Sequence, residues 1–194
     1  MSEKTALFPL KTVLLPGCTL DLQLFEARYL DMVSRCFKAG EGFVVVALEK
    51  GPESGTGDLR FSALGCEAQI VDFQQRDNGL LGIRVLGGRR AQVSDVEVAA
   101  DGLVLAQVQW RAEAEDDNLV VAHDELETLH AALLEHPLAS GLGLPPVGRS
   151  QQALAYQLAY LLPFSLDQKT HLLALDHPAE RLQQITEWLE VLQA

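Results

Sequence analysis

The segment GLPPVGRS at residues 143–150 has the glycine spacing of a phosphate-binding loop, with arginine in place of the usual lysine. Such a loop holds phosphate with successive backbone N–H groups that point at the ligand. Pro145 and Pro146 remove two of these donors, and no strand pattern leads into the segment. We therefore predict no nucleotide site here.

Three side chains could begin a metal site, because His123, Glu127 and His130 are spaced to share one face of a helix. Zinc needs four ligands in a structural site and three in most catalytic ones, and no further ligand is evident nearby. We interpret the three as a solvated helix face and predict no metal.

The three cysteines, Cys18, Cys36 and Cys66, are 18 and 30 residues apart, which is no metal-binding spacing. A nucleophilic cysteine needs a base and an electropositive setting. Cys36 falls on an apolar helical stripe and Cys66 falls in a strand, so we predict that all three pack in or near the core. The chain also lacks the GxSxG and HExxH motifs. We predict no catalytic residues, no cofactor and a reducing, cytoplasmic setting.

Glu26, Arg28 and Tyr29 form the remaining candidate, where a strand pattern changes to a helix pattern. In a structural interpretation Glu26 accepts N–H groups at the start of the helix, Arg28 reaches a carbonyl or carboxylate across the fold, and Tyr29 is core. In a functional interpretation the three contact a bound substrate, with Arg28 and Tyr29 at the rim of a peptide groove.

The elements that must position these residues are strands in the first half of the chain. Leucines at 20, 22 and 24 alternate with polar residues, as in a strand with one buried face, and an apolar stripe between residues 29 and 37 predicts a helix that ends at Gly40. Further strands are expected at 7–10, 13–15, 43–48, 63–73, 80–86, 89–98 and 103–110, with a break at Gly87-Gly88. Six or seven short strands and one helix indicate a small barrel.

The second half has a helical pattern and a different charge. Residues 1–112 hold 12 basic and 14 acidic side chains (net −2), whereas residues 113–194 hold 3 and 13 (net −10). Helices are expected from Leu119 to Pro137, after Ser150, at 166–174 after the capping box of Ser165, and after Asp176. We predict two subdomains, 1–112 and 113–194, the second a helical bundle with Leu182, Ile185, Leu189 and Leu192 facing inward.

Several of these residues together resemble the LON domain, the N-terminal substrate-binding domain of ATP-dependent Lon proteases. They are Phe8-Pro9-Leu10, Val13-Leu14-Leu15-Pro16-Gly17, Leu20, Leu22, Phe25-Glu26-Ala27-Arg28-Tyr29 and Met32, followed more loosely by Leu161-Leu162-Pro163, Lys169, Leu172-Leu173 and Glu180-Arg181-Leu182. Ala27 stands where many relatives carry proline. The resemblance implies an α+β fold, a PUA-like β pseudobarrel followed by a helical bundle.

The resemblance also implies a non-catalytic module that binds unfolded or exposed polypeptide segments or a partner protein. We expect the site in a groove between barrel and bundle. The PUA-like fold is shared with RNA-binding proteins, but no basic footprint is present, so nucleic acid is not expected. A small-molecule enzyme with dispersed site residues is the other alternative, which three or more titratable groups in one pocket would favour. No apolar run is long enough to cross a membrane.

Overall fold

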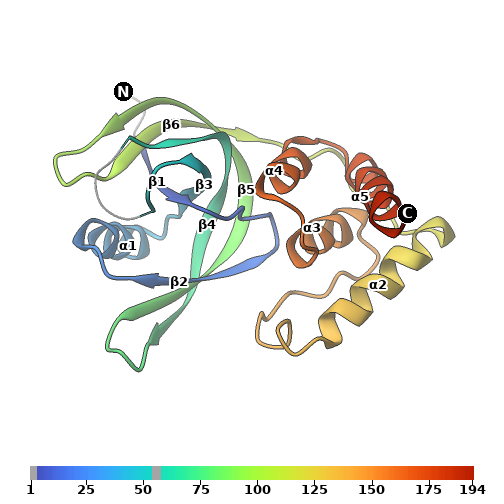
Figure 1. The fold of residues 1–194 in the computed structure, drawn as a ribbon. Coiled ribbons are helices and arrows are strands. Elements are labelled where there is room, and N and C mark those ends of the chain that lie inside the picture. Colours follow the sequence, from blue (N-terminus) through green and yellow to red (C-terminus); the bar gives the residue numbers. More distant parts are fainter. Residues whose placement is uncertain (1–3, 54–57) are drawn as a thin grey trace. The chain divides into compact units, whose positions relative to one another are not determined.

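In the part of the chain that the structure describes, six strands and one helix come first, and the later elements are helical (Figure 1). The computed structural model describes residues 4–53 and 58–194. The strands are β1 (Thr5–Leu10), β2 (Thr19–Leu24), β3 (Phe43–Lys50), β4 (Arg60–Gln75), β5 (Leu81–Val98) and β6 (Val104–Arg111). Two compact units result, Met1–Arg111 and Ala112–Ala194. The predicted α+β class is confirmed.

The strands close into a ring because the long strand β5 has different partners along its length. Its first half pairs with β2 and β4, and its second half pairs with β4 and β6. Strand β6 also pairs with β1, which lies parallel to β3, and β3 pairs with β4. The ring therefore runs β5-β4-β3-β1-β6, with β2 added outside it on β5. All pairs except β1–β3 are antiparallel.

Helix α1 (Ala27–Ala39) forms where the apolar stripe predicts it. Tyr29, Met32 and Val33 are buried in one core cluster with residues of β1, β2, β3 and β5. Gly40 ends the helix in the left-handed conformation at φ 68°, which glycine adopts without a steric penalty.

Two segments differ from the predicted strands. Residues 13–15 are a buried loop, not a strand. The Gly87-Gly88 pair does not break the chain, and β5 continues through it. A Cβ atom on Gly87 would lie 2.1 Å from the carbonyl oxygen of Leu15, so the glycine allows the loop to pass directly over β5. Backbone hydrogen bonds from Gly17 N to Gly87 O and from Gly87 N to Cys18 O hold the loop there.

The second unit contains a 3-10 turn η1 (Val121–His123) and helices α2 (Asp124–Glu135), α3 (Gln151–Leu161), α4 (Leu166–Ala174) and α5 (Pro178–Gln193). Ser150 caps α3 and the capping box of Ser165 and Gln168 begins α4, both as predicted. The last helix begins one residue later than predicted, because His177 is its N-cap and Pro178 takes the first helical position, where its missing N–H costs nothing. Leu182 and Ile185 are buried, but Leu192 is exposed, so its predicted inward position is wrong.

No helix in the described part of the chain combines the length and the apolar character needed to cross a membrane.

Candidate functional site

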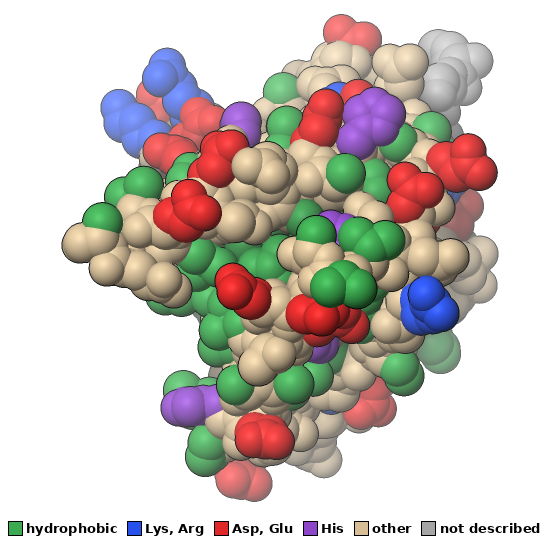
Figure 2. Space-filling model, turned by 90° about the vertical axis from the view of Figure 1, so that its right-hand side faces the viewer, with side chains coloured by type: hydrophobic (Ala, Val, Ile, Leu, Met, Phe, Trp, Pro, Cys, Tyr) green, Lys and Arg blue, Asp and Glu red, His purple; other side chains and the backbone are tan. Residues whose placement is uncertain are grey.

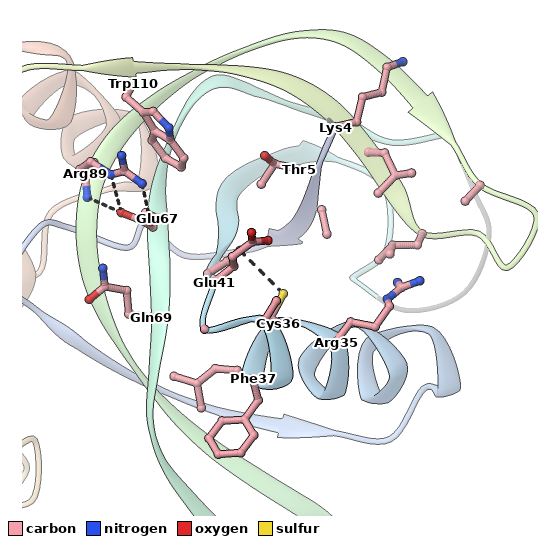
Figure 3. A pocket seen from close by; sticks show the side chains of 18 of the residues that line it. Lys4, Thr5, Arg35, Cys36, Phe37, Glu41, Glu67, Gln69, Arg89 and Trp110 are labelled. Carbon is pink, nitrogen blue, oxygen red and sulfur yellow. Dashed lines mark hydrogen bonds and ion pairs between the residues drawn. The ribbon is translucent and has the colours of Figure 1, made fainter. Parts of the chain in front are cut away.

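A cavity of about 1030 Å³ lies within the first unit, between the C-terminal end of α1 and the strands β4, β5 and β6 (Figure 3). We call it the α1–β4 pocket. The residues that line it come from both ends and from the middle of the first unit's sequence. They are Lys4, Thr5, Ala6, Arg35, Cys36, Phe37, Ala39, Gly40, Glu41, Gly42, Glu67, Gln69, Ile70, Arg89, Ala99, Asp101, Leu103, Leu105 and Trp110.

An ion pair and an indole ring form one side of the pocket, with Glu67, Arg89 and Trp110 grouped together (Figure 3). The guanidinium of Arg89 donates two hydrogen bonds of 2.9 Å to the two carboxylate oxygens of Glu67. Its carbon atom Cζ lies 3.9 Å from the centroid of the Trp110 ring, a cation–π contact. The hydrogen bonds from Arg89 hold the pKa of Glu67 below its ordinary value, so this carboxylate is a weak base.

Glycine makes room for this ion pair. A Cβ atom on Gly88 would lie 2.8 Å from Oε2 of Glu67, which is closer than a real side chain allows. A Cβ atom on Gly42, on the other side of β4, would lie 2.6 Å from the carbonyl oxygen of Ala68. Because glycine has no Cβ atom, the backbone at both positions can lie close to β4 around the pocket.

The last turn of α1 forms the opposite side. Phe37 is 61% exposed and its ring meets that of Phe73 from β4 edge to face, with centroids 5.0 Å apart. The thiol of Cys36 is half-buried and donates to the carbonyl oxygen of Gly42 at 3.7 Å. Burial, followed by the charge of Glu41, raises the pKa of this thiol. A raised pKa disfavours the thiolate, so Cys36 is a poor nucleophile at neutral pH.

The structure explains Glu26, Arg28 and Tyr29 by contacts within the first unit. Nη1 of Arg28 donates to the carbonyl oxygen of Gly102 at 2.8 Å, as the structural interpretation predicts, and its Nε lies 2.8 Å from Glu26 Oε2. The predicted cap is wrong, since the side chain of Glu26 accepts no hydrogen bond from the start of α1. Arg28 and Tyr29 are only 7% and 5% exposed, and Tyr29 stacks on Phe8 with ring centroids 4.0 Å apart.

Burial raises the pKa of Tyr29, in agreement with its place in the core. Glu26, Arg28 and Tyr29 are not among the residues that line the α1–β4 pocket. Contact of these three side chains with a bound polypeptide stays a prediction.

The pocket residues were not recognisable as a site in the sequence. Glu67 and Arg89 are 22 residues apart, and they meet because β4 and β5 pair with a register shift between Cys66 and Ala68. No local pattern encodes that register. The one available signal was Gly87-Gly88 next to Arg89, since paired glycines within a strand indicate close approach of another group.

The other chemical candidates have structural roles. Ser150 accepts the N–H of Ala153 as the cap of α3 and donates to Asp116. The carbonyl oxygen of Pro145 accepts a hydrogen bond from Gln157. Segment 143–150 is thus hydrogen-bonded to α3, and the hydroxyl of Ser150 both donates one hydrogen bond and accepts another.

The interpretation of His123, Glu127 and His130 as a solvated face is wrong for His130. This residue is buried, and its Nε2 lies 2.8 Å from Oε1 of Gln157. His123 instead accepts the N–H of Val120. Within residues 4–53 and 58–194, no three His, Cys, Asp or Glu side chains are placed to hold a metal ion. Cys18 and Cys66 are fully buried, as predicted.

The chain belongs to the family of ATP-dependent protease La (LON) substrate-binding domains, whose family model matches residues 4–191. This confirms the resemblance that the sequence indicates. The Lon N-terminal domain protein from Xanthomonas campestris is 35% identical, and its crystal structure matches with a TM-score of 0.78 over 96% of this chain and 99% of that one.

Two more distant relatives are similar to the chain. The N-terminal domain of the Mycobacterium avium complex Lon protease is 20% identical, and its TM-score of 0.64 over 96% of this chain and 97% of that one shows a common fold. Protein cereblon from Danio rerio is 31% identical over 100 residues. These residues are 50% of this chain and 22% of cereblon, so the chain matches less than a quarter of that relative.

Proposed function

We propose that this chain is a non-catalytic module that binds polypeptide segments in the α1–β4 pocket. Membership of the LON substrate-binding family supports binding of protein substrates. The observation that carries the proposal is the composition of the pocket: its main ion pair, Arg89 and Glu67, is internally satisfied, while the exposed rings of Phe37 and Trp110 remain on its surface. Aromatic side chains are enriched in protein interfaces and among the residues that contribute most to binding.

The pocket does hold several titratable groups, which is the condition that would favour an enzyme. Their contacts argue against catalysis. Lys4 pairs with Glu97 at 2.7 Å, Asp101 accepts the N–H of Leu103, and Arg89 is occupied by Glu67. A catalytic base would need a raised carboxyl pKa and a nucleophilic cysteine a lowered one, whereas the pKa of Glu67 is lowered and that of Cys36 is raised.

The charge distribution argues against nucleic acid. Three basic residues line the pocket, Lys4, Arg35 and Arg89, beside three acidic residues, Glu41, Glu67 and Asp101. Residues 113–194 carry a net charge of −10, and Figure 2 shows acidic side chains spread over one face of the molecule with few basic ones among them. RNA binding requires a basic surface that neutralises phosphates.

Titration of two labelled ligands tests the proposal on the full chain. One is a reduced, carboxymethylated and therefore unfolded protein, and the other is a single-stranded RNA, each followed by fluorescence anisotropy at low and high salt. We expect the unfolded protein to bind with little change in affinity between the two salts, because apolar contacts are not screened. RNA that binds more tightly than the polypeptide, and loses affinity with salt, would contradict the proposal.

A further inference from the structure

Strand β4 has partners on both sides along only part of its length. Its pairing with β3 ends at Phe43 and Ala68, whereas its pairing with β5 continues to Gln75 and Leu81. Among the described residues, no strand pairs with the outer edge of β4 over residues 69–75. An unpaired strand edge presents a row of backbone N–H and C=O groups to which another extended chain can bond.

The α1–β4 pocket lies where β3 would continue along this edge. Residues 40–42 lead from α1 into β3 and line the pocket, as do Gln69 and Ile70 immediately after the last β3–β4 pair. The chain that precedes β3 thus turns away into α1 and leaves the next positions along β4 open. An added strand in line with β3 would enter the pocket.

The edge has some of the features that keep strands from pairing with other chains and lacks others. The β4–β5 pairing shifts register between Ile70 and Asp72, which marks a bulge within this edge. Residues 69–75 (QIVDFQQ) contain no proline and no lysine, and Asp72 is their single charged residue. The carboxylate of Asp72 accepts the N–H of Phe73 at 2.9 Å, so this backbone donor already has a partner. Val71 and Phe73 are exposed, and Phe73 contacts the exposed ring of Phe37.

We propose that an extended polypeptide segment adds as a strand to the edge of β4 at residues 69–75, with apolar side chains against Phe37 and Phe73. This inference rests on the proposed function and specifies how the polypeptide binds. The occupant is a main chain because the open groups are main-chain donors and acceptors. The equal numbers of basic and acidic residues in the pocket also suit a neutral backbone better than a polyanion.

Backbone recognition predicts a broad substrate class. Main-chain hydrogen bonds supply affinity in strand addition, and the side chains on one face of the added strand supply preference. We therefore expect segments with alternating apolar residues to bind, with little dependence on their exact sequence. Folded proteins, whose strands are already paired, are expected to bind weakly.

Peptide N-methylation provides the test, because it removes backbone donors without changing side chains. The probe is a fluorescent ten-residue peptide of alternating valine and threonine with lysine at both ends. Two further versions carry N-methyl groups at alternate residues, on either the even or the odd positions. In an added strand only one of these sets faces β4, so we expect one version to lose affinity on the order of tenfold or more and the other to bind nearly as well as the probe.

Hydrogen exchange locates the peptide on the full chain. We expect amides within residues 69–75 to exchange more slowly when the probe is bound. Val71→Lys should weaken binding several-fold by placing a charge on the edge, whereas Val98→Lys, at an exposed β5 position outside the pocket, should not. Equal affinity of both N-methylated versions, or protection confined to other strands, would overturn the inference.

The outcomes separate this inference from the proposed function. Binding of the unfolded protein without any N-methyl preference would overturn strand addition alone. Absence of binding by the unfolded protein and by the probe would overturn both. A dimer in sedimentation whose residues 69–75 are protected without peptide would show a second copy on the edge, and would also overturn the inference.

Discussion

Arg28 links the start of α1 to the turn between β5 and β6. Its guanidinium donates to Gly102 and pairs with Glu26 while almost fully buried. The local sequence indicates that Arg28 sits at a strand-to-helix junction, but it cannot show that the carbonyl it reaches lies 74 residues away. The hydrogen bond from Arg28 to the carbonyl oxygen of Gly102 is therefore a stabilising contact whose partner could not be identified from the sequence.

We predict that Arg28→Met lowers the free energy of unfolding by about 1–3 kcal/mol, because it leaves the Gly102 carbonyl and the Glu26 carboxylate without this donor. Arg35→Met, at an exposed position of the same helix, should stay within about 0.5 kcal/mol. Urea denaturation measures both. If Arg28→Met left stability unchanged and instead weakened polypeptide binding, Arg28 would be a ligand contact and the structural account would be wrong.

The Glu67–Arg89 pair predicts a pH dependence. Because the pKa of Glu67 is lowered in the folded protein, the unfolded state takes up a proton first as the pH falls. The stabilisation is complete above the ordinary carboxyl pKa of 4.5 and is lost as the pH falls through the lower folded-state pKa. The stability difference between wild type and Glu67→Gln should therefore shrink between about pH 7 and about pH 3. A difference that is constant over this range would mean that Arg89 does not lower this pKa.

At the level of elements, patterns that depend on nearby residues were predicted well. The Gly40 end of the helix, the Ser150 cap and the Ser165 capping box each act within about one turn of helix, and the α1 stripe repeats over successive turns of one helix. Sequence spacing is therefore enough to recognise them. Strand continuity was predicted less well. Gly87-Gly88 has the composition of a break, yet tertiary contacts with the 15–18 segment hold it in β5.

The location of the site was predicted least well, because it too depends on tertiary contacts between distant residues. The α1–β4 pocket depends on the register of β4 against β5 and on where β3 stops, and neither is visible in local spacing. A binding groove between barrel and bundle stays a prediction, as does the PUA-like assignment.

Gly87 gives a direct test of the loop packing. A Cβ atom there would meet the carbonyl oxygen of Leu15 at 2.1 Å, so Gly87→Ala must displace backbone and should cost about 1–3 kcal/mol or more. Gly141→Ala is the matched control, since nothing lies within 4 Å of its added Cβ atom, and it should change stability by less than about 0.5 kcal/mol. Thermal or urea unfolding of both variants decides, and equal stabilities would contradict the tight loop contact.

At the level of the whole molecule, a near-neutral strand-rich unit precedes a strongly acidic helical one. The acidic unit should steer basic polypeptides toward the chain and raise their association rate at low salt, with smaller changes in dissociation. The affinity itself should come from apolar contacts in the first unit, at roughly 25 cal/mol per Å² of apolar surface buried. Because the affinity comes from apolar contacts and charge acts mainly on the association rate, we expect the complex to persist at high salt.

One pair of variants tests whether polypeptide binds in the α1–β4 pocket. Phe37 and Phe25 are both 61% exposed, but only Phe37 lines the pocket. We predict that Phe37→Ser weakens binding of an unfolded, carboxymethylated protein on the order of tenfold, since an aromatic contact is lost. Phe25→Ser should leave the dissociation constant unchanged. Equal affinities for the two variants, or a loss confined to Phe25→Ser, would show that polypeptide does not bind in this pocket.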